Sequence, residues 1–471
     1  LDNWIGYFPL RSVEMKTRMR QAGWLLVVED DGADYGARME RLAKGEIDFA
    51  VATVDSYLLN AARHNYPGAI IMVIDESKGG DAILARAERV DSIDGLKGRT
   101  DLRVAFTPDS PSHHLAKAAA EHFGAAELLP PPGDSRRIET NGSDAALEKL
   151  MAGTADVAIC WEPDVSHGLA RQGIVKILGT EDTEKLIVDI LVVSRDYAAK
   201  NPQVVELLVS NYFRVLKTFR DDPARLQKAV RDDTGLSEEA VATMLKGVRW
   251  VTLTENCEQW FGISAPGSLG FDGLVETVEA TVRILLSAGD FSDSPLPGND
   301  PYRLVQSSFL ERLFTQGLTG FTSPNDSDRS VSSLEATFTA LSQAEWDKLK
   351  EVATLKMDPI VFQAGASELD FLAKKEVDEA VQRLSHYPNF RVEIRGHTSD
   401  QGDAQANRAL SQDRADAVAR YLQVVYNVDP NRMRAQGHGG DKPLERLPGE
   451  SQRAWRYRLP RVEVVLVREE F

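Results

Sequence analysis

The sequence predicts an α/β protein in two parts, a two-lobed unit over residues 1–315 and a small α/β sandwich over residues 341–471. Three observations predict this organisation. β-Rich runs alternate with amphipathic stretches in the first part. A twelve-residue pattern occurs twice there, and residues 316–340 form a polar segment that is typical of a linker. The length of 471 residues suits about three domain-sized units.

Apolar strands and amphipathic helices alternate along the first 315 residues. We expect strands at residues 25–29, 49–54, 70–74, 102–106, 157–161 and 187–193, and helices at residues 35–44, 112–123 and 202–219. This order is typical of βαβ units in a parallel or mixed sheet.

The repeated pattern predicts two lobes of similar build. Residues 40–51 (Glu-Arg-Leu-Ala-Lys-Gly-Glu-Ile-Asp-Phe-Ala-Val) recur as residues 148–159 (Glu-Lys-Leu-Met-Ala-Gly-Thr-Ala-Asp-Val-Ala-Ile). In each copy a helix ends at a Gly that suits a left-handed C-cap, and an apolar strand follows. Since Gly-x-x-Asp is common at such joints, chance also accounts for part of the likeness. We expect lobe 1 over about residues 1–82 plus 190–315, and lobe 2 over about residues 83–189.

Both repeated strands end in polar clusters, residues 53–56 (Thr-Val-Asp-Ser) and residues 161–164 (Trp-Glu-Pro-Asp). Ligands of open α/β sheets lie beyond the carboxyl ends of the strands. We therefore expect both clusters to face a cleft between the lobes.

The charge and hydropathy of the chain exclude some classes of function. The net charge of −17, with acidic and basic residues interspersed, indicates a soluble surface and argues against nucleic acid as a partner. The longest apolar runs, residues 69–74 and 190–193, are far shorter than the ~20 residues that span a bilayer. Since the sequence starts at Leu1 without Met, an export signal or a membrane anchor upstream of Leu1 is compatible with it.

Neither a metal nor a cofactor is expected. Cys160 and Cys257 form no disulfide framework and no metal-ligand cluster, so they are either two buried thiols or one long-range disulfide. His113 and His114 are adjacent, which is not the ligand spacing of a helix. No Gly-x-Ser-x-Gly elbow or phosphate loop occurs. These observations favour binding over catalysis.

Five motifs in the first 315 residues carry a family resemblance. They are residues 4–10 (Trp-Ile-Gly-Tyr-Phe-Pro-Leu), 45–50 (Gly-Glu-Ile-Asp-Phe-Ala), 79–81 (Gly-Gly-Asp), 110–113 (Ser-Pro-Ser-His) and 161–164. In order and spacing this part resembles the periplasmic binding proteins for nitrate, sulfonates and taurine, a family that also contains the thiamine-pyrimidine synthases. The resemblance implies a type 2 periplasmic binding protein, a Venus flytrap that closes on a small solute. The synthases rely on a cysteine-rich segment that this sequence lacks.

The chemistry of the motifs sharpens this expectation. Ser112 precedes an Ala-rich run, so it is a candidate N-cap beside backbone N–H groups that suit an anion, or a plain N-cap without a ligand. Opposite it, Asp55, Asp81 and Glu162 offer negative charge to an ammonium or guanidinium group, or are solvated loop residues. Together they favour a zwitterionic or anionic solute. The candidate ligand-binding residues are Trp4, Tyr7, Asp55, Ser56, Asp81, Ser110, Ser112, His113, Trp161 and Glu162.

The aromatic side chains among these candidates have two possible positions in the fold. Trp4, Tyr7 and Trp161 are expected either to form apolar walls of the cleft or to belong to the core.

The C-terminal part predicts a small α/β sandwich. We expect a short helical piece at residues 343–353, strands at 359–362, 390–395, 432–436 and 461–467, and helices at 371–386 and 404–426.

The C-terminal part also carries a family resemblance. It is carried by residues 360–362 (Ile-Val-Phe), 392–398 (Val-Glu-Ile-Arg-Gly-His-Thr), 410–415 (Leu-Ser-Gln-Asp-Arg-Ala), 437–439 (Gly-His-Gly) and 461–463 (Arg-Val-Glu), with Gly402 and Asn407. The part is similar to the OmpA-like, peptidoglycan-associated family, which is found also in flagellar stator proteins. In that family an Asp after the Gly-His-Thr element binds the ammonium group of the diaminopimelate stem peptide. The Arg of the Leu-Ser-x-x-Arg-Ala element binds its carboxylate.

Arg414 matches this pattern, and the acidic position departs from it. Ser399 stands in place of the family's Asp, and Asp400 follows it. Either Asp400 takes the role, or Ser399 supplies a neutral hydrogen bond, or wall binding is lost. Arg414 could instead pair with Asp413 or Asp400 at the surface. The candidate peptidoglycan-binding residues are Thr398, Ser399, Asp400, Asn407 and Arg414.

The two resemblances together predict a periplasmic or cell-envelope protein. It would capture a solute for uptake or sensing while its C-terminal domain binds peptidoglycan. An ABC permease or an envelope complex would be the partner. The alternative is a scaffold or sensor in an envelope complex with no transport role.

Overall fold

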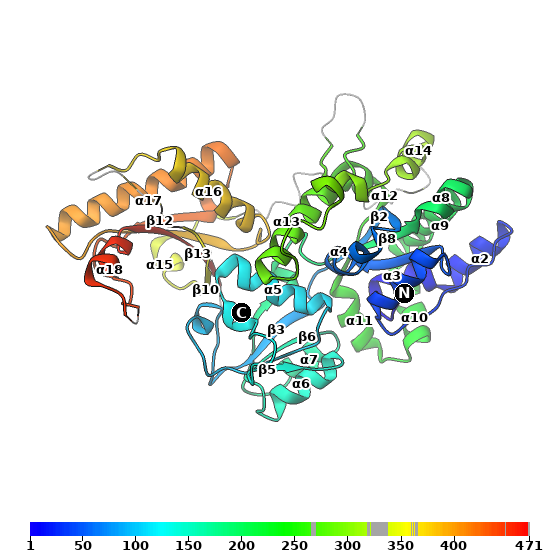
Figure 1. Cartoon of the computed structure of the whole chain (residues 1–471), viewed down its shortest axis with the longest axis horizontal. Helices are drawn as coiled ribbons and strands as arrows, with labels where there is room; N and C mark the ends of the chain where they lie inside the picture. Colours follow the sequence, from blue (N-terminus) through cyan, green and yellow to red (C-terminus); the bar gives the residue numbers. More distant parts are fainter. Residues whose placement is uncertain are drawn as a thin grey trace. The chain divides into compact units, whose positions relative to one another are not determined.

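The computed structural model divides into two compact units (Figure 1). It describes residues 1–264, 270–317, 321, 338–358, 360, 362, 366–447 and 449–469. Unit 1 comprises Leu1–Ala87, Arg103–Ala118 and Leu129–Ser333. Unit 2 comprises Glu88–Leu102, Ala119–Leu128 and Leu334–Phe471.

The first sheet of unit 1 has four antiparallel strands in the order β1-β8-β2-β9. Their bounds are β1 (Phe49–Thr53), β8 (Val188–Ser194), β2 (Gly68–Ser77) and β9 (Val248–Trp250). All ten residues of β2 are buried, which fits its nearly continuous apolar sequence because the central strand of a covered sheet has no exposed face.

Helices with apolar stripes surround this sheet. In α9, Val205, Leu208, Val209, Tyr212 and Leu216 follow the helical spacing and are buried. The helices are α1 (Phe8–Arg11), α2 (Val13–Gln21), α3 (Tyr35–Lys44), α4 (Val54–Ala61), α8 (Arg195–Lys200), α9 (Pro202–Asp221), α10 (Pro223–Thr234), α11 (Glu238–Lys246), α12 (Leu253–Glu255), α13 (Gly273–Ala288) and α14 (Ser308–Gln316). Short helical turns are η1 (Ile5–Tyr7), η2 (Ala62–His64), η5 (Thr180–Asp182), η6 (Asn256–Trp260), η7 (Pro297–Asn299) and η8 (Pro301–Leu304).

The second sheet of unit 1 is mixed, with the order β5-β4-β6-β3-β7. β4 pairs in parallel with β5 and β6, while β3 pairs antiparallel with β6 and β7. The bounds are β3 (Asp81–Arg86), β4 (Val104–Phe106), β5 (Arg137–Glu139), β6 (Val157–Trp161) and β7 (Ile174–Gly179), with helices α5 (Pro111–Phe123), α6 (Ser143–Met151) and α7 (Asp164–Leu169). The α/β fold class predicted for this part is confirmed.

The two copies of the repeated pattern occupy equivalent joints in the two sheets. The first copy joins α3 to β1 and the second joins α6 to β6. Gly45 and Gly153 have φ angles of 71° and 70°, in the left-handed region that favours glycine. The chain passes between the sheets at residues 78–80 and 180–187, while the exact lobe and domain bounds stay predictions.

Unit 2 contains a four-stranded sheet in the order β10-β13-β11-β12. β11 and β12 are parallel, and the other pairs are antiparallel. The strands are β10 (Lys350–Thr354), β11 (Arg391–His397), β12 (Met433–Gly437) and β13 (Arg461–Arg468). The helices are α15 (Gln343–Trp346), α16 (Phe371–Leu384), α17 (Ala404–Tyr426) and α18 (Gln452–Arg458), with turns η3 (Asp94–Leu96), η4 (Ala126–Leu128) and η12 (Pro430–Arg432). α17 packs on β11 and β12, and Figure 1 shows α16 beside it.

Three predicted elements differ from the structure. Residues 25–29 do not join a sheet, and the side chains of Leu25 and Val27 are 73% and 68% exposed because no strand covers them. The helix predicted at residues 343–353 stops at Trp346, and Lys350–Thr354 instead pairs with β13, which buries Val352 and Ala353.

The strand predicted at residues 359–362 falls partly outside the described residues, and neither Ile360 nor Phe362 lies in a strand. Most of the predicted linker, residues 316–340, also lies outside them.

Cys160 and Cys257 are separate buried thiols, so the disulfide alternative is wrong. Across the described part of the chain, every helix is too short or too polar to cross a bilayer.

Candidate functional site

A cavity of about 1260 Å³ lies in unit 1 and is lined by residues from elements of both sheets. Thr53, at the end of β1, lines it from the first sheet, and Trp161 lines it from the end of β6 in the second. The carboxyl ends of the two repeated strands therefore reach one cavity. Of the ten residues predicted to bind a solute, six line it, namely Trp4, Tyr7, Asp81, Ser110, Trp161 and Glu162.

The other four predicted residues do not line it and are buried, namely Asp55, Ser56, Ser112 and His113. Ser56 belongs to a capping box with Thr53, whose backbone N–H donates to the Ser56 hydroxyl at 3.0 Å. The ring of His113 stacks on Phe106 at 4.4 Å and accepts a hydrogen bond from the Asp109 amide at 3.3 Å. Burial lowers the pKa of His113 to about 2, so this ring is neutral and offers no charge to an anion.

The first turn of α5 differs from the prediction. Pro111 is the first helical residue, and Ser110 is therefore the N-cap in place of Ser112. The Ser110 hydroxyl accepts from the His113 amide at 3.1 Å and donates to the Thr107 carbonyl at 2.8 Å. Ser112 donates to the carboxyl group of Asp81. Ser112 and Asp81 therefore contact each other and do not lie on opposite sides of the cleft.

Asp81 is the most constrained acid of the cavity wall. Its carboxyl group also accepts from the Ser77 hydroxyl at 2.7 Å. Burial, together with the negative charges of Asp55 and Glu162, raises the pKa of Asp81 to about 6. This group is thus ready to change its charge near neutral pH.

A pair of carboxyl groups that sequence reasoning missed lies at one wall. Asp75 and Asp189 are directly opposite each other in the β2–β8 ladder. Tyr7 donates its hydroxyl hydrogen to Asp189, and the Trp4 indole N–H donates to Asp75 at 3.1 Å. Burial raises the pKa of Asp75 to about 7, and burial and the charge of Asp75 raise that of Asp189. The pair therefore holds a proton at neutral pH.

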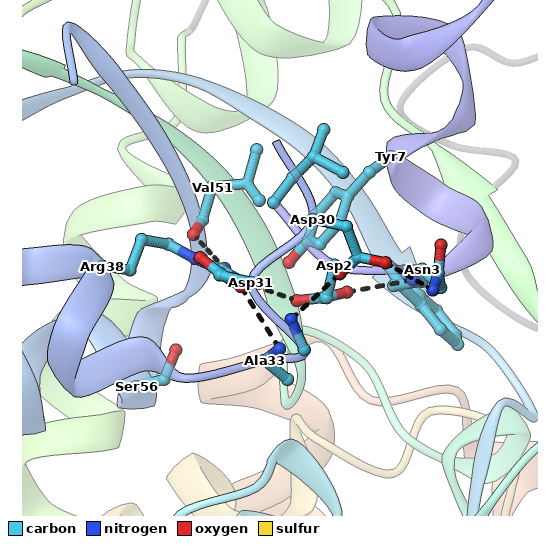
Figure 2. A network of polar contacts seen from close by, with 12 residues as sticks. Asp2, Asn3, Tyr7, Asp30, Asp31, Ala33, Arg38, Val51 and Ser56 are labelled. Atoms are coloured by element: carbon cyan, nitrogen blue, oxygen red, sulfur yellow. Dashed lines mark hydrogen bonds and ion pairs between the residues drawn. The ribbon is translucent and has the colours of Figure 1, made fainter. Parts of the chain in front are cut away.

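A buried arginine, also missed from the sequence, fixes another wall (Figure 2). Arg38 of α3 is 1% exposed and donates to Asp31 at 2.7 Å, to the Val51 carbonyl at 2.7 Å and to Asp2 at 3.1 Å. Burial raises the pKa of Asp31, but the hydrogen bond and charge of Arg38 outweigh it and lower this pKa. These hydrogen bonds and ion pairs connect residues 1–4 to residues 29–34. An Arg inside an amphipathic helix gives no sequence signal of such a role.

The described residues contain no group of three or more His, Cys, Asp or Glu side chains that could hold a metal ion.

A second candidate site lies on α17 in unit 2. Arg414 is 6% exposed, its guanidinium lies 4.7 Å from the centre of the Phe362 ring, and its Nε donates to the Ala366 carbonyl at 3.1 Å. Within the described ranges no carboxylate pairs with it, so neither predicted pair with Asp413 or Asp400 forms. Burial lowers the pKa of Arg414. A buried cation without a carboxylate partner is suited to an anionic ligand.

The other four predicted wall-binding residues gather near the start of α17. Asn407 donates to the Gln401 carbonyl at 2.8 Å, and the Ser399 hydroxyl accepts from the Gln401 amide at 3.1 Å. Thr398 donates its amide hydrogen to the Gly439 carbonyl at 2.9 Å. Asp400 forms an ion pair with Arg456 of α18 at 3.7 Å.

Glycines let this loop and the strands approach α17. A Cβ on Gly396 would come 2.0 Å from the Ser411 carbonyl oxygen, and one on Gly440 would come 2.6 Å from the Ser399 carbonyl oxygen. On α17, Asn407, Ser411 and Arg414 recur at a spacing that places them on one face. The glycines therefore hold residues 398–402 against that face.

Comparison with known proteins assigns both parts. Residues 26–225 match the family described as NMT1/THI5 like, and residues 361–456 match the OmpA family. The peptidoglycan-associated lipoprotein of Rhizobium meliloti is 36% identical over 87 residues, 18% of this chain and 49% of that protein. Outer membrane protein Omp38 of Acinetobacter baumannii is 35% identical over 85 residues, 18% of this chain and 24% of that protein. The chain thus spans half or less of these two relatives.

Solved structures similar to the chain include two sulfonate-binding proteins. The periplasmic aliphatic sulphonate binding protein of Escherichia coli has a TM-score of 0.45 and 17% identity, covering 66% of this chain and 92% of that one. A putative periplasmic sulfonate-binding protein of Methylobacillus flagellatus KT has a TM-score of 0.49 and 16% identity, covering 67% and 90%. The chain carries an NMT1/THI5-like domain and, C-terminal to it, a domain of the OmpA family.

Proposed function

We propose that this protein captures a small solute in the cavity of unit 1 and binds peptidoglycan through α17 of unit 2, at the cell envelope. The observation that carries the proposal is the cavity itself, which residues from both sheets line. A closable cleft between two sheets joined at residues 78–80 and 180–187 suits reversible capture of a ligand.

The walls of the cavity favour binding without catalysis. Trp4, Tyr35 and Trp161 give apolar faces, while carboxyl groups stand between them. His113, the histidine of the predicted site, is neutral and packed on Phe106, so it is poorly placed to act as a general base.

Wall binding is supported by Arg414. The Phe362 ring and the Ala366 carbonyl hold its guanidinium in one orientation, and a stem-peptide carboxylate would find a preformed planar donor. Relatives of this domain include peptidoglycan-associated lipoproteins. We propose that diaminopimelate supplies the carboxylate, and that Ser399 or Asp400 contacts its ammonium group.

Domain organisation follows from the same proposal. We propose a solute-binding part over residues 1–315, a linker over 316–340 and a wall-binding part over 341–471. A solute-binding domain fixed to the wall would serve uptake through an ABC permease or sensing in an envelope complex.

Two measurements on the full chain test the proposal. Native mass spectrometry of the purified protein should detect a co-purified small molecule, and thermal unfolding with candidate solutes should show stabilisation with the solute recovered unchanged. Co-sedimentation with sacculi that contain diaminopimelate should pellet the protein at moderate salt. A protein that stays in the supernatant would make the C-terminal domain a protein-contact module. Chemical conversion of the solute would contradict binding without catalysis.

A further inference from the structure

The cavity of unit 1 is lined far more by acids than by bases. Its charged lining residues are nine acids, Asp2, Asp30, Asp31, Asp34, Asp81, Asp109, Glu162, Asp189 and Asp233, and two bases, Arg11 and Arg63. Acids of one sign in a concave wall reinforce one another, because the low-dielectric surroundings focus their field into the cavity.

Internal ion pairs neutralise only part of this charge. Arg38, behind the wall, pairs with Asp2 and Asp31. Arg11 pairs with Asp233 at 3.1 Å. The Arg63 guanidinium donates to the Asn60 amide oxygen at 2.8 Å. Apart from Asp189, which shares a proton with Asp75, eight lining acids therefore face three guanidinium groups in and behind the wall.

Three of the remaining acids, on both sides of the cavity, accept hydrogen bonds from neutral donors. On the first-sheet side, Asp30 accepts from the Asn3 side chain at 2.7 Å, and Asp34 caps α3. On the second-sheet side, Glu162 accepts from the hydroxyl of Ser166 at 2.7 Å. Neutral hydrogen bonds stabilise a carboxylate but leave its charge uncompensated.

Asp55 adds a further negative charge behind the cavity wall. It is 2% exposed at the start of α4, and among the residues that the structure describes none donates a hydrogen bond to its carboxyl group or forms an ion pair with it. Its charge acts on Asp81 and Tyr35, two residues that line the cavity, so it lies within electrostatic reach of a bound ligand. The first turn of α4 also favours a negative charge at this position, so Asp55 adds to the charge of the lining acids.

The anion-binding features expected at α5 do not offset this charge. The hydroxyl of Ser110 is used in capping and that of Ser112 is used by Asp81. A sulfonate or phosphonate group in this cavity would meet like charge on both sides, which disfavours it by mutual repulsion.

We propose that the cavity binds an organic cation with two or more separated positive charges, of the aliphatic diamine or polyamine class. Acids on both walls can pair with both ends of such a ligand, whereas a singly charged ligand would leave one wall unpaired. Trp4 and Trp161 line the cavity and offer aromatic surface to its ammonium groups and methylene chain. The proposal rests on the solute-binding role of unit 1 and names the class of its solute.

Asp81 should make binding of the cation depend on pH. Its pKa near 6 falls when a cation binds beside it, so binding of a cation releases protons and strengthens as pH rises through 6. An anionic ligand requires the opposite pH dependence.

Isothermal titration of the full chain with spermidine, putrescine, taurine and ethanesulfonate, at pH 5 and pH 7.5, tests the proposal. Spermidine and putrescine should bind, more tightly at pH 7.5, while ethanesulfonate should not. Glu162→Gln and Asp109→Asn should each weaken spermidine binding by about tenfold or more. The exposed Glu279→Gln of α13 is the matched control for loss of one charge and should bind like the parent, and circular dichroism should show all variants folded.

The outcomes separate this inference from the proposed function. Binding of taurine or ethanesulfonate without binding of either amine would overturn the inference and leave the solute-binding role intact. If a co-purified neutral or anionic molecule stabilises the protein and the amines do not, the inference also fails alone. If no small molecule binds or co-purifies, both fail. Equal loss in Glu279→Gln and Glu162→Gln would show a nonspecific charge effect and overturn the inference.

Discussion

The hydroxyl group of Ser112 donates a hydrogen bond to the carboxyl group of Asp81, joining the first turn of α5 to the first residue of β3. With the hydroxyl of Ser77, it supplies the hydrogen bonds that partly offset burial of this acid. Because burial outweighs them, the pKa of Asp81 stays near 6, above its ordinary value of 3.8.

This relationship predicts how stability depends on pH without a ligand. The folded pKa of Asp81 exceeds the unfolded value, so the folded state binds more protons. Its contribution is full below about pH 4 and is lost as pH rises through about 6. The loss should amount to about 2–3 kcal/mol, at ~1.4 kcal/mol per pKa unit. Thermal unfolding of the ligand-free chain between pH 4 and pH 8 measures it. Asp81→Asn should flatten this part of the profile, and identical profiles for parent and variant would refute the assignment.

Arg38→Met should destabilise unit 1 by about 3–5 kcal/mol at pH 7, because the buried Asp2 and the partly buried Asp31 lose their shared cation. The difference in the free energy of unfolding between parent and variant should become smaller at acid pH. The lowered pKa of Asp31 means that the stability gained from Arg38 is present above pH 3.8 and disappears as pH falls through the folded value.

Thermal unfolding monitors this change, with Arg41→Met as the control on the same helix. Arg41 is partly exposed and pairs with Glu29 at the surface, so its loss should change stability far less than the loss of Arg38. Equal effects of the two substitutions would contradict the role of Arg38.

Local pattern was sufficient for most of the fold. The helix at Tyr35–Lys44 and the helix at Ala404–Tyr426 have the bounds that their apolar spacing predicts, since each is amphipathic and capped by its own sequence. The strand predicted at residues 25–29 is wrong because strand propensity produces a strand only where a neighbouring strand can pair with it. β10 was missed for the converse reason, as pairing with β13 overrides the helical pattern that begins at Gln343.

The candidate site was predicted less completely. Trp161 and Glu162 could be placed at the cavity because they follow a strand, and strand ends are predictable. Asp75 and Asp189 could not, because each interrupts an apolar strand and only the ladder register brings them together. The roles of Ser112 and Arg38 depend on side chains from distant segments, which no local pattern specifies.

Arg414→Ala should release the full chain from sacculi, because the stem-peptide carboxylate would lose its planar donor. Charged hydrogen bonds of this kind contribute about 1.5–3 kcal/mol, which corresponds to roughly ten- to a hundredfold in affinity. Arg414→Lys should recover only part of the binding, since a lysine keeps the charge but not the fork.

Co-sedimentation with purified sacculi measures these variants, and Arg420→Ala, exposed on the same helix, is the control. If the variants at 414 and 420 pellet alike, Arg414 is not the carboxylate ligand.

Variants at Ser399 and Asp400 test which side chain binds the ammonium group of the stem peptide. Ser399→Asp should strengthen binding to sacculi, because a carboxylate beside the stem-peptide ammonium adds a Coulomb contribution on the order of 1–4 kcal/mol, depending on how well the site excludes water.

Asp400 already forms an ion pair with Arg456 of α18 at 3.7 Å, and this guanidinium competes with any ligand ammonium group. If Asp400 holds the ammonium group, Asp400→Asn should weaken binding and Arg456→Ala should strengthen it by removing that competitor. If Asp400→Asn leaves binding unchanged while Ser399→Asp increases it, the hydroxyl of Ser399 occupies the acidic position of the family. A Ser399→Asp variant that binds no better than the parent would show that the ammonium group lies elsewhere.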